Sequence, residues 1–147
     1  TPGWKFNYWE MRGIPVRLEI GPKDDAKKQV VLVRRDTGEK IFVKVSKLEK
    51  EMEKILSSIQ KNLFAKAKKF LDSNITSVKS YEDFKKVLKS KGGFVKASWC
   101  GDSDCEEQIK VETNADIRVI PFKMEKSGKC VYCGKAGKEV VYFAKAY

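Results

Sequence analysis

The arrangement of the four cysteines constrains the fold of this chain more than any other feature of its sequence. They form two pairs in the last third of the chain, Cys100-x4-Cys105 and Cys130-x2-Cys133. Two thiolates spaced by two to four residues can reach one ion, and two such pairs complete a tetrahedral site. The spacing therefore predicts a structural zinc centre held by Cys100, Cys105, Cys130 and Cys133.

Other uses of these thiols remain open at this point. The pairs could form disulfides, although we expect no secretory segment that would place the chain in an oxidising compartment. Cys130 and Cys133 could act as a redox pair, although no strand–CxxC–helix pattern surrounds them. Four thiols without a role are the remaining possibility. A site closed by four thiolates leaves no position for water, so we expect the metal to support folding rather than catalysis.

Histidine is absent from the sequence, which excludes several classes of catalytic site. Ser-His-Asp and Cys-His catalysis, HExxH metalloproteases and zinc fingers with histidine ligands all require it. Among 147 residues, 31 are Lys or Arg and 20 are Asp or Glu, which gives a net charge of +11. This excess favours RNA, DNA or an anionic membrane as a partner, and a solvated lysine-rich surface is the plain alternative. No apolar run approaches the roughly 18 residues of a membrane span, so we expect no membrane partner.

Hydrophobic patterning predicts a first part made of one helix and three strands. Residues 4–12 have the spacing of a helix, and we expect its aromatic residues Trp4, Tyr8 and Trp9 to lie in the core. Strands are predicted over residues 15–20, 29–34 and 39–45, the last two as a hairpin whose turn is shaped by Arg34, Arg35 and Asp36. The residues that follow Gly21-Pro22 are predicted to be a loop.

A long amphipathic helix is predicted next. It begins at Ser46, where Glu49 completes a capping box, and it runs to about residue 71. Apolar residues at steps of three and four follow one side, and lysines cover the other. We interpret the apolar stripe as core packing, with a partner groove as the alternative, and the lysine face as solvated, with RNA contact as the alternative.

A second part follows a polar stretch near residues 73–79. Ser80 is predicted to cap a helix with Asp83 in the reciprocal position. Further elements are a helix over residues 106–112 and strands over residues 94–99, 117–122 and 139–144. We expect three regions, namely residues 1–47, a connecting helix and linker over residues 48–78, and residues 79–147.

The run from Pro2 to Asp24, PGWKFNYWEMRGIPVRLEIGPKD, resembles the anticodon-binding domain of prolyl-tRNA synthetases of the archaeal and eukaryotic-like type. The likeness continues through residues 29–40, resumes with the two cysteine pairs and ends at residues 141–147, so it covers nearly the whole chain. It implies an α/β fold: a partial anticodon-binding mixed sheet, followed by a small zinc-bound α+β domain.

The sequence lacks the catalytic core of that family, with its ATP and magnesium site, and the first strand–helix–strand part of the anticodon-binding domain. It also begins at Thr1 rather than Met. We therefore expect a C-terminal fragment that does not aminoacylate tRNA by itself. The resemblance implies as partners the anticodon stem-loop of proline tRNA and the catalytic domain of the same enzyme. It also implies a cytoplasmic, homodimeric, ATP-dependent parent enzyme, in which the carboxylate of Tyr147 turns back towards the active site.

The chemistry of guanine is compatible with this resemblance. Proline codons are CCN, so every proline anticodon has guanine at its second and third positions. The Watson–Crick edge of guanine has two N–H donors beside the O6 acceptor, which a neighbouring carboxylate and cation can satisfy. The resemblance carries anticodon contact onto Glu10, Arg17, Lys23 and Asp24, and Phe6 is a candidate for base stacking. The plain alternative is a surface ion pair between Glu10 and Arg17.

Two other functions stay open from the sequence. A free-standing zinc-ribbon protein would bind nucleic acid through charge alone, with similar affinity for all tRNAs and a steep salt dependence. A thiol redox enzyme would have a reactive, low-pKa thiol at Cys130 or Cys133 and no stoichiometric metal.

Overall fold

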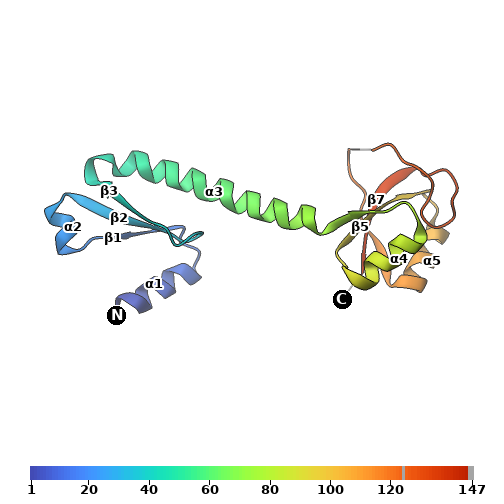
Figure 1. The fold of residues 1–147 in the computed structure, drawn as a ribbon, viewed down its shortest axis with the longest axis horizontal. Helices are drawn as coiled ribbons and strands as arrows, with labels where there is room; N and C mark the ends of the chain where they lie inside the picture. Colours follow the sequence, from blue (N-terminus) through green and yellow to red (C-terminus); the bar gives the residue numbers. More distant parts are fainter. Residues whose placement is uncertain (124, 146–147) are drawn as a thin grey trace. The chain divides into compact units, whose positions relative to one another are not determined.

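The computed structural model describes residues 1–123 and 125–145 of the chain. The chain divides into two compact units, Thr1–Lys68 and Lys69–Tyr147, which are described separately below (Figure 1). The expectation for Tyr147 lies outside the described residues. No helix among the described residues combines the length and the apolar character needed to cross a membrane.

A three-stranded antiparallel sheet organises the first unit. Its strands lie in chain order: β1 (Val16–Glu19), β2 (Gln29–Arg34) and β3 (Lys40–Lys44). The helical elements are α1 (Pro2–Met11), α2 (Pro22–Ala26), the 3-10 turn η1 (Val45–Lys47) and α3 (Leu48–Ser73), which continues past the end of the unit. The predicted β2–β3 hairpin is confirmed, whereas α2 lies where a loop was predicted.

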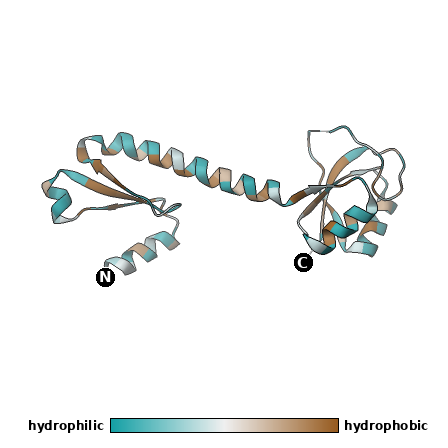
Figure 2. Ribbon diagram, in the orientation of Figure 1, coloured by the Kyte–Doolittle hydropathy of each residue, from teal (hydrophilic) through white to brown (hydrophobic). Residues whose placement is uncertain are grey.

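The central strand β2 supplies the core of the first unit. Val30 and Leu32 pack with Val43 of β3 and with Ile55 and Ile59 of α3. These last two are the buried residues of α3, so the predicted core packing holds for the first half of its apolar stripe. Figure 2 shows hydrophobic residues recurring along the whole helix between hydrophilic ones.

The second half of the apolar stripe of α3 is exposed, which the sequence did not predict. Leu63 and Phe70 remain 42% and 73% exposed. A helix rises about 1.5 Å per residue, so a helix of 26 residues extends well beyond a sheet of strands with four to six residues. The apolar stripe of α3 is therefore longer than the sheet surface that could bury it.

Helix α1 does not enter the core, so the prediction for its aromatic residues is wrong. None of its residues is buried, and Trp4 and Trp9 are 64% and 52% exposed. Tyr8 instead stacks on Trp4, with ring centroids 5.0 Å apart, and meets the edge of Trp9 at 5.1 Å. Polar residues are distributed around the whole helix, so it has no continuous apolar side to bury.

A four-stranded sheet with the order β4-β5-β7-β6 forms the second unit. Its elements are β4 (Ile75–Ser77), α4 (Tyr81–Ser90), β5 (Phe94–Trp99), α5 (Ser103–Thr113), β6 (Ala115–Val119) and β7 (Glu139–Lys145). Strands β4 and β5 are parallel and the other neighbours are antiparallel, so this sheet is mixed. In the first unit, where a mixed sheet was expected, the described strands are all antiparallel, because its connections include no crossover that would return a strand in parallel.

Both helices of the second unit pack on one face of its sheet (Figure 1). The core contains Phe84, Leu88, Val95, Ala97, Ile109, Ala115, Val131, Val141 and Phe143. The rings of Phe84 and Phe143 meet edge to face, with centroids 5.1 Å apart. Because side chains alternate along a strand, the residues between these core positions on β5 and β7 lie on the other, helix-free face.

Element ends in the second unit follow the sequence in most places. The Ser80 hydroxyl accepts a hydrogen bond from the Asp83 amide at 3.1 Å, which confirms the predicted cap of α4. Strand β6 ends at Val119, three residues before the predicted end, and β4 occupies a stretch predicted to be a linker.

Candidate metal centre and anticodon-reading cluster

The four cysteines meet in the second unit. Cys100 follows β5, Cys105 lies in the first turn of α5, and Cys130 and Cys133 belong to the loop between β6 and β7. All four sulfur atoms lie within 4.8 Å of one another. Cys105 and Cys130 are buried, and the other two are half-buried. The structure therefore brings together the ligand set that the sequence predicted.

The sulfur separations distinguish between a disulfide and a metal site. The Sγ atoms of Cys100 and Cys105 are 3.6 Å apart, and those of Cys100 and Cys133 are 3.8 Å apart. A disulfide requires about 2.05 Å. Four sulfurs placed tetrahedrally at about 2.3 Å from one zinc ion lie about 3.8 Å from each other. The spacing therefore fits a tetrahedral thiolate site for a soft divalent cation.

The two cysteine pairs share one feature of backbone conformation. Cys100 and Cys133 are each followed by a glycine with positive φ, +87° at Gly101 and +72° at Gly134. A residue with a side chain rarely adopts this conformation. In each pair the next amide, that of Asp102 or Lys135, forms a hydrogen bond with the cysteine sulfur. The Gly134 amide donates a hydrogen bond to the Cys130 carbonyl oxygen at 3.0 Å, which closes the turn between the two cysteines.

These surroundings act on the thiols in opposite directions. Burial raises the pKa of Cys105 well above its ordinary value. The hydrogen bond from the Lys135 amide is the main reason that the pKa of the Cys133 thiol is lowered to about 7. A buried thiolate needs a compensating positive charge, which a bound cation supplies.

A tyrosine–carboxylate contact anchors the second cysteine pair, and the sequence analysis missed it. Tyr132, between Cys130 and Cys133, donates a hydrogen bond to Glu112 of α5 at 3.1 Å. Tyr81 of α4 donates to the other oxygen of the same carboxylate at 3.0 Å. The two tyrosine rings meet edge to face at 5.1 Å. Three segments far apart in sequence thus converge beside the candidate metal centre, and no local pattern reports such a meeting.

In the first unit, three of the predicted RNA-contacting residues form one cluster. Arg17 of β1 forms an ion pair with Glu10 of α1, and its guanidinium lies 3.9 Å from the centroid of the Phe6 ring. Arg17 also donates through Nε to Glu19 at 2.8 Å. The Nζ atom of Lys40 lies 3.9 Å from the same Glu19 carboxylate. Neither Glu19 nor Lys40 was among the predicted contacts.

Arg17 is the centre of this cluster. Partial burial alone would lower the pKa of Arg17, but hydrogen bonds and charge from Glu19 and Glu10 outweigh burial and raise it. The guanidinium therefore stays charged and is held in one orientation by two carboxylates and one ring. Glu10 remains about half exposed, with 48% of its side chain accessible, so its carboxylate is open to a ligand.

Lys23 and Asp24 belong to α2, and the contacts of Asp24 are with the start of this helix and with β2 rather than with the Arg17 cluster. Asp24 accepts hydrogen bonds from the Gly21 amide at 3.3 Å and from the Gln29 side chain at 3.0 Å, which caps the helix. The Lys23 side chain is exposed. The structure therefore gives Asp24 a local structural role that the prediction of a loop had left out.

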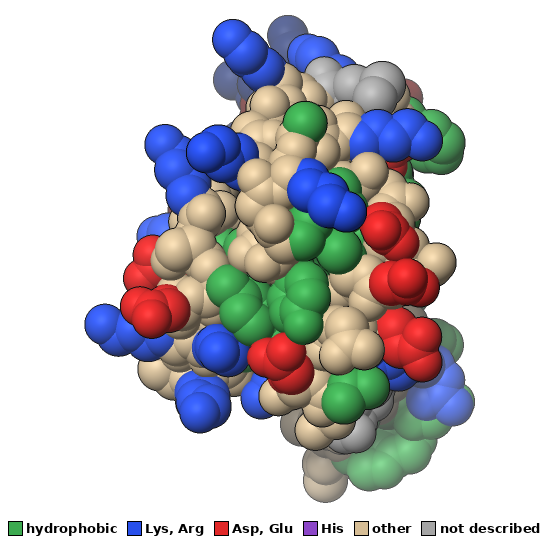
Figure 3. Space-filling model, turned by 90° about the vertical axis from the view of Figure 1, so that its right-hand side faces the viewer, with side chains coloured by type: hydrophobic (Ala, Val, Ile, Leu, Met, Phe, Trp, Pro, Cys, Tyr) green, Lys and Arg blue, Asp and Glu red, His purple; other side chains and the backbone are tan. Residues whose placement is uncertain are grey.

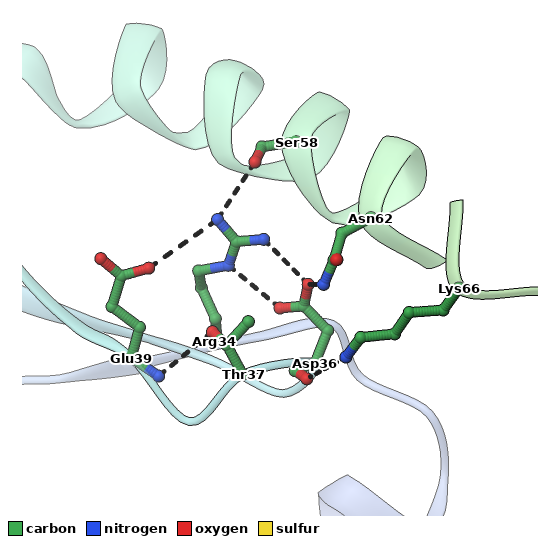
Figure 4. Close-up of polar contacts among 7 residues, drawn as sticks. All are labelled: Arg34, Asp36, Thr37, Glu39, Ser58, Asn62 and Lys66. Carbon is green, nitrogen blue, oxygen red and sulfur yellow. Dashed lines mark hydrogen bonds and ion pairs between the residues drawn. The ribbon is translucent and has the colours of Figure 1, made fainter. Parts of the chain in front are cut away.

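The hairpin turn is fixed to α3 by a second polar network (Figure 4). Arg34 binds both carboxylate oxygens of Asp36, at 3.0 and 2.8 Å, and also donates to Ser58 at 3.1 Å. Asn62 donates to the same Asp36 carboxylate. The Arg34 hydrogen bonds hold the pKa of Asp36 well below its usual range. The expectation that Arg34 and Asp36 shape the turn is confirmed, whereas the side chain of Arg35, the third residue expected there, is exposed and its amide donates to the Pro15 carbonyl oxygen at 3.0 Å.

On one face of the molecule, charge is mixed rather than concentrated. On the face drawn in Figure 3, basic side chains are spread widely, and acidic and apolar side chains lie among them. No single basic field covers this view, so charge alone does not mark a binding surface on this face. Selectivity on this face must come from particular side-chain clusters.

Comparisons with known proteins match the two ends of the chain to two different families. Residues 1–55 match the family described as anticodon binding domain, and residues 81–147 match the family described as prolyl-tRNA synthetase, C-terminal. The first match defines a class, the proteins that carry a tRNA anticodon-binding domain. The second narrows it, and the chain belongs to the prolyl-tRNA synthetase family, in which it corresponds to the C-terminal part.

Curated relatives show the same relationship. The chain is 53% identical over 148 residues to proline–tRNA ligase 2 of Bacillus thuringiensis subsp. konkukian, a match that spans 100% of this chain and 31% of the relative. It is 50% identical over 149 residues to the proline–tRNA ligase of Natranaerobius thermophilus, with 100% and 31% coverage. For the Oceanobacillus iheyensis proline–tRNA ligase, identity is 53% over 147 residues, with 99% and 30% coverage. The chain thus spans about a third of the length of these bacterial relatives. Its assignment to the archaeal and eukaryotic-like type stays a prediction.

Proposed function

We propose that this chain is the tRNA-binding C-terminal region of a proline–tRNA ligase and that it reads the two guanines of the proline anticodon. The observation that carries the proposal is the contact of Glu10 and Arg17, which the family resemblance selects, with Phe6, the candidate for base stacking. The match of residues 1–55 to anticodon-binding domains supports it.

In the proposed recognition, the Glu10 carboxylate accepts the two N–H groups of a guanine edge while Arg17 donates to O6 or N7. Glu19 keeps the guanidinium oriented when Glu10 turns to the base, because Glu19 binds Nε and leaves the terminal nitrogens available. The ring of Phe6 then stacks on a splayed base. Lys23 and Asp24 on α2 would contact the neighbouring anticodon nucleotide, with Lys23 exposed for a phosphate.

We propose that Cys100, Cys105, Cys130 and Cys133 hold one structural zinc ion. The sulfur separations and the paired glycine turns support this assignment. When bound, zinc would supply folding free energy to the second unit, and no coordination position would remain for catalysis.

The whole protein, on this proposal, is a cytoplasmic, homodimeric ligase that uses ATP and magnesium in a catalytic domain this sequence does not contain. Without that domain the chain would not aminoacylate tRNA. We propose that residues 1–47, 48–78 and 79–147 serve as anticodon reader, connector and zinc domain. The start of α3 at Leu48 supports the first of these boundaries.

The test is base discrimination by the full-length ligase. Glu10→Ala or Arg17→Ala should weaken binding of proline tRNA by about 1–3 kcal/mol and reduce the preference for guanine over adenine at the second and third anticodon positions. Glu53→Gln, which changes an exposed carboxylate on α3 in the same unit, serves as the control. An unchanged guanine preference in both Glu10→Ala and Arg17→Ala would reject the assignment and favour binding through charge alone.

A further inference from the structure

The helix-free face of the second sheet carries a group of side chains that the proposed anticodon reading does not use. Lys96 of β5 lies opposite Tyr142 of β7, and Ser98 lies opposite Val140. Residues two apart share a face of a strand, so all four lie on one side of the sheet. The buried neighbours Val95 and Ala97 face the helices instead.

One end of this face opens into a cavity of about 640 Å³. Four lysines line it, together with three serines and a single acidic residue. The polar lining residues are Ser77, Lys79, Lys96, Ser98, Glu125, Lys126, Ser127 and Lys129. The lining therefore has an excess of positive charge together with hydroxyl groups, which suits an anion with several oxygen acceptors, such as a phosphate group.

Lys96 connects this cavity to an aromatic pair. Its Nζ atom lies 5.7 Å from the centroid of the Tyr142 ring, and that ring meets Phe94 edge to face at 6.5 Å. Phe94, like Tyr142, is partly buried and keeps part of its surface accessible. A partly accessible ring beside a lysine-lined cavity places a stacking surface and a phosphate contact within reach of one nucleotide.

The acidic residue of the cavity forms an ion pair with Lys96. Glu125 binds Lys96 through both carboxylate oxygens, at 2.6 and 2.7 Å, and 50% of the Glu125 side chain is exposed. An anion entering the cavity competes with this carboxylate for Lys96. Removing the charge of Glu125 should therefore act in the direction opposite to removing that of Lys96.

We propose that this face binds a single-stranded RNA segment, with a phosphate in the cavity at Lys96 and a base against Tyr142. The choice of RNA rests on the proposed function, whereas the geometry of the site is independent of the anticodon-reading cluster. The chain would then have a second RNA contact, in the unit that contains the cysteines.

The test uses the full chain and a uridine decamer, which contains no guanine. Fluorescence anisotropy as a function of salt should show that Lys96→Met weakens binding at least about fivefold and lowers the slope of log K against log salt by about 0.7, the contribution of one phosphate contact. Tyr142→Leu should also weaken binding at least about fivefold, because a base loses its stacking partner. Glu125→Gln should strengthen binding.

Two controls separate this site from others. Lys86→Met removes the same charge from the exposed surface of α4, which covers the opposite face of the sheet, and should leave affinity within about twofold. Glu53→Gln, which changes an exposed carboxylate of α3 in the first unit, should also leave uridine binding unchanged, and the guanine preference is measured separately with proline tRNA. Each proposal can therefore fail without the other.

Photocrosslinking of a decamer with one 4-thiouridine locates the base directly. We expect the crosslink on Tyr142 or Phe94. Inorganic phosphate should compete with the decamer in the wild-type chain and compete less in Lys96→Met. Equal losses in Lys96→Met and Lys86→Met, weaker binding in Glu125→Gln, or a crosslink confined to the first unit would overturn the proposal. Circular dichroism of each variant confirms folding.

Discussion

The two units achieve their structure by different means. The second unit buries Phe84, Phe143 and Ile109 completely between its sheet and two helices, and it adds a cluster of four cysteines. The first unit has a smaller apolar core centred on β2 and leaves the large side chains Trp4 and Phe42 exposed. Small domains with limited cores commonly depend on a metal or on further contacts for stability. Both units leave large apolar side chains exposed, Phe122 in the second among them, but in the first they include Trp4 and Trp9 of the helix that carries Glu10.

Removing the metal should produce the largest difference in stability between the two units. Binding of structural zinc by cysteine sites contributes roughly 10–16 kcal/mol of apparent free energy, so chelation or Cys105→Ser should unfold the second unit. Hydrogen exchange measured by mass spectrometry should show loss of protection in β5 and β7 while β2 stays protected. Metal analysis should find about one zinc ion per chain before chelation, and a metal-free chain with a protected second unit would contradict the assignment.

Core substitutions sharpen the comparison further. Phe143→Ala removes a ring with no exposed surface and should destabilise the second unit by about 3–5 kcal/mol. Phe42→Ala removes a ring that is 66% exposed on the first unit and should change stability by no more than about 0.5 kcal/mol. Urea denaturation of the two variants measures the difference. Similar losses would show that the ring of Phe42 is covered in solution.

The Asp36 network makes the first unit sensitive to acid. Arg34 lowers the pKa of Asp36, so the ionised carboxylate stabilises the fold above its ordinary pKa of about 3.9, and this stabilisation disappears as pH falls towards the lowered value. Asp36→Asn should therefore lower the urea midpoint of the first unit at pH 6 and flatten its decline between pH 5 and pH 2. The exposed Asp25, changed to Asn, is the matched control and should retain the wild-type pH profile.

The smallest effect is expected at the tyrosine pair. Tyr81→Phe removes one hydrogen bond to Glu112 and leaves the ring contacts with Phe84 and Tyr132 in place. A single hydrogen bond at an exposed carboxylate contributes about 0.5–1 kcal/mol. Thermal unfolding of the zinc-loaded chain should detect this loss in the second unit. A loss as large as that of Phe143→Ala would mean that Glu112 organises the cysteine loop rather than only supporting it.

Much of the secondary structure was predictable because it depends on local patterns. The β2–β3 hairpin, α4 with its Ser80 cap and strand β5 all lie where periodicity and capping residues placed them. The short elements α2 and β4 were not predicted, because five and three residues are too few to establish a period. The exposure of Trp4 and Trp9 was also missed, since residue type indicates a tendency to be buried but not whether a partner surface exists.

The candidate sites show the same difference between what local sequence predicts and what tertiary contacts decide. Cysteine spacing by itself predicted the candidate ligand set, because two closely spaced pairs can complete a tetrahedral thiolate site and this chain has four cysteines. Family resemblance selected Glu10 and Arg17, and the chemistry of base stacking selected Phe6. Only the tertiary structure joined Lys40 to that cluster, placed Tyr81 beside Tyr132, and set Lys96 between a cavity and an aromatic ring. Spacing along the chain determines what a local segment can bind, whereas contacts between distant segments depend on how strands pair and helices pack.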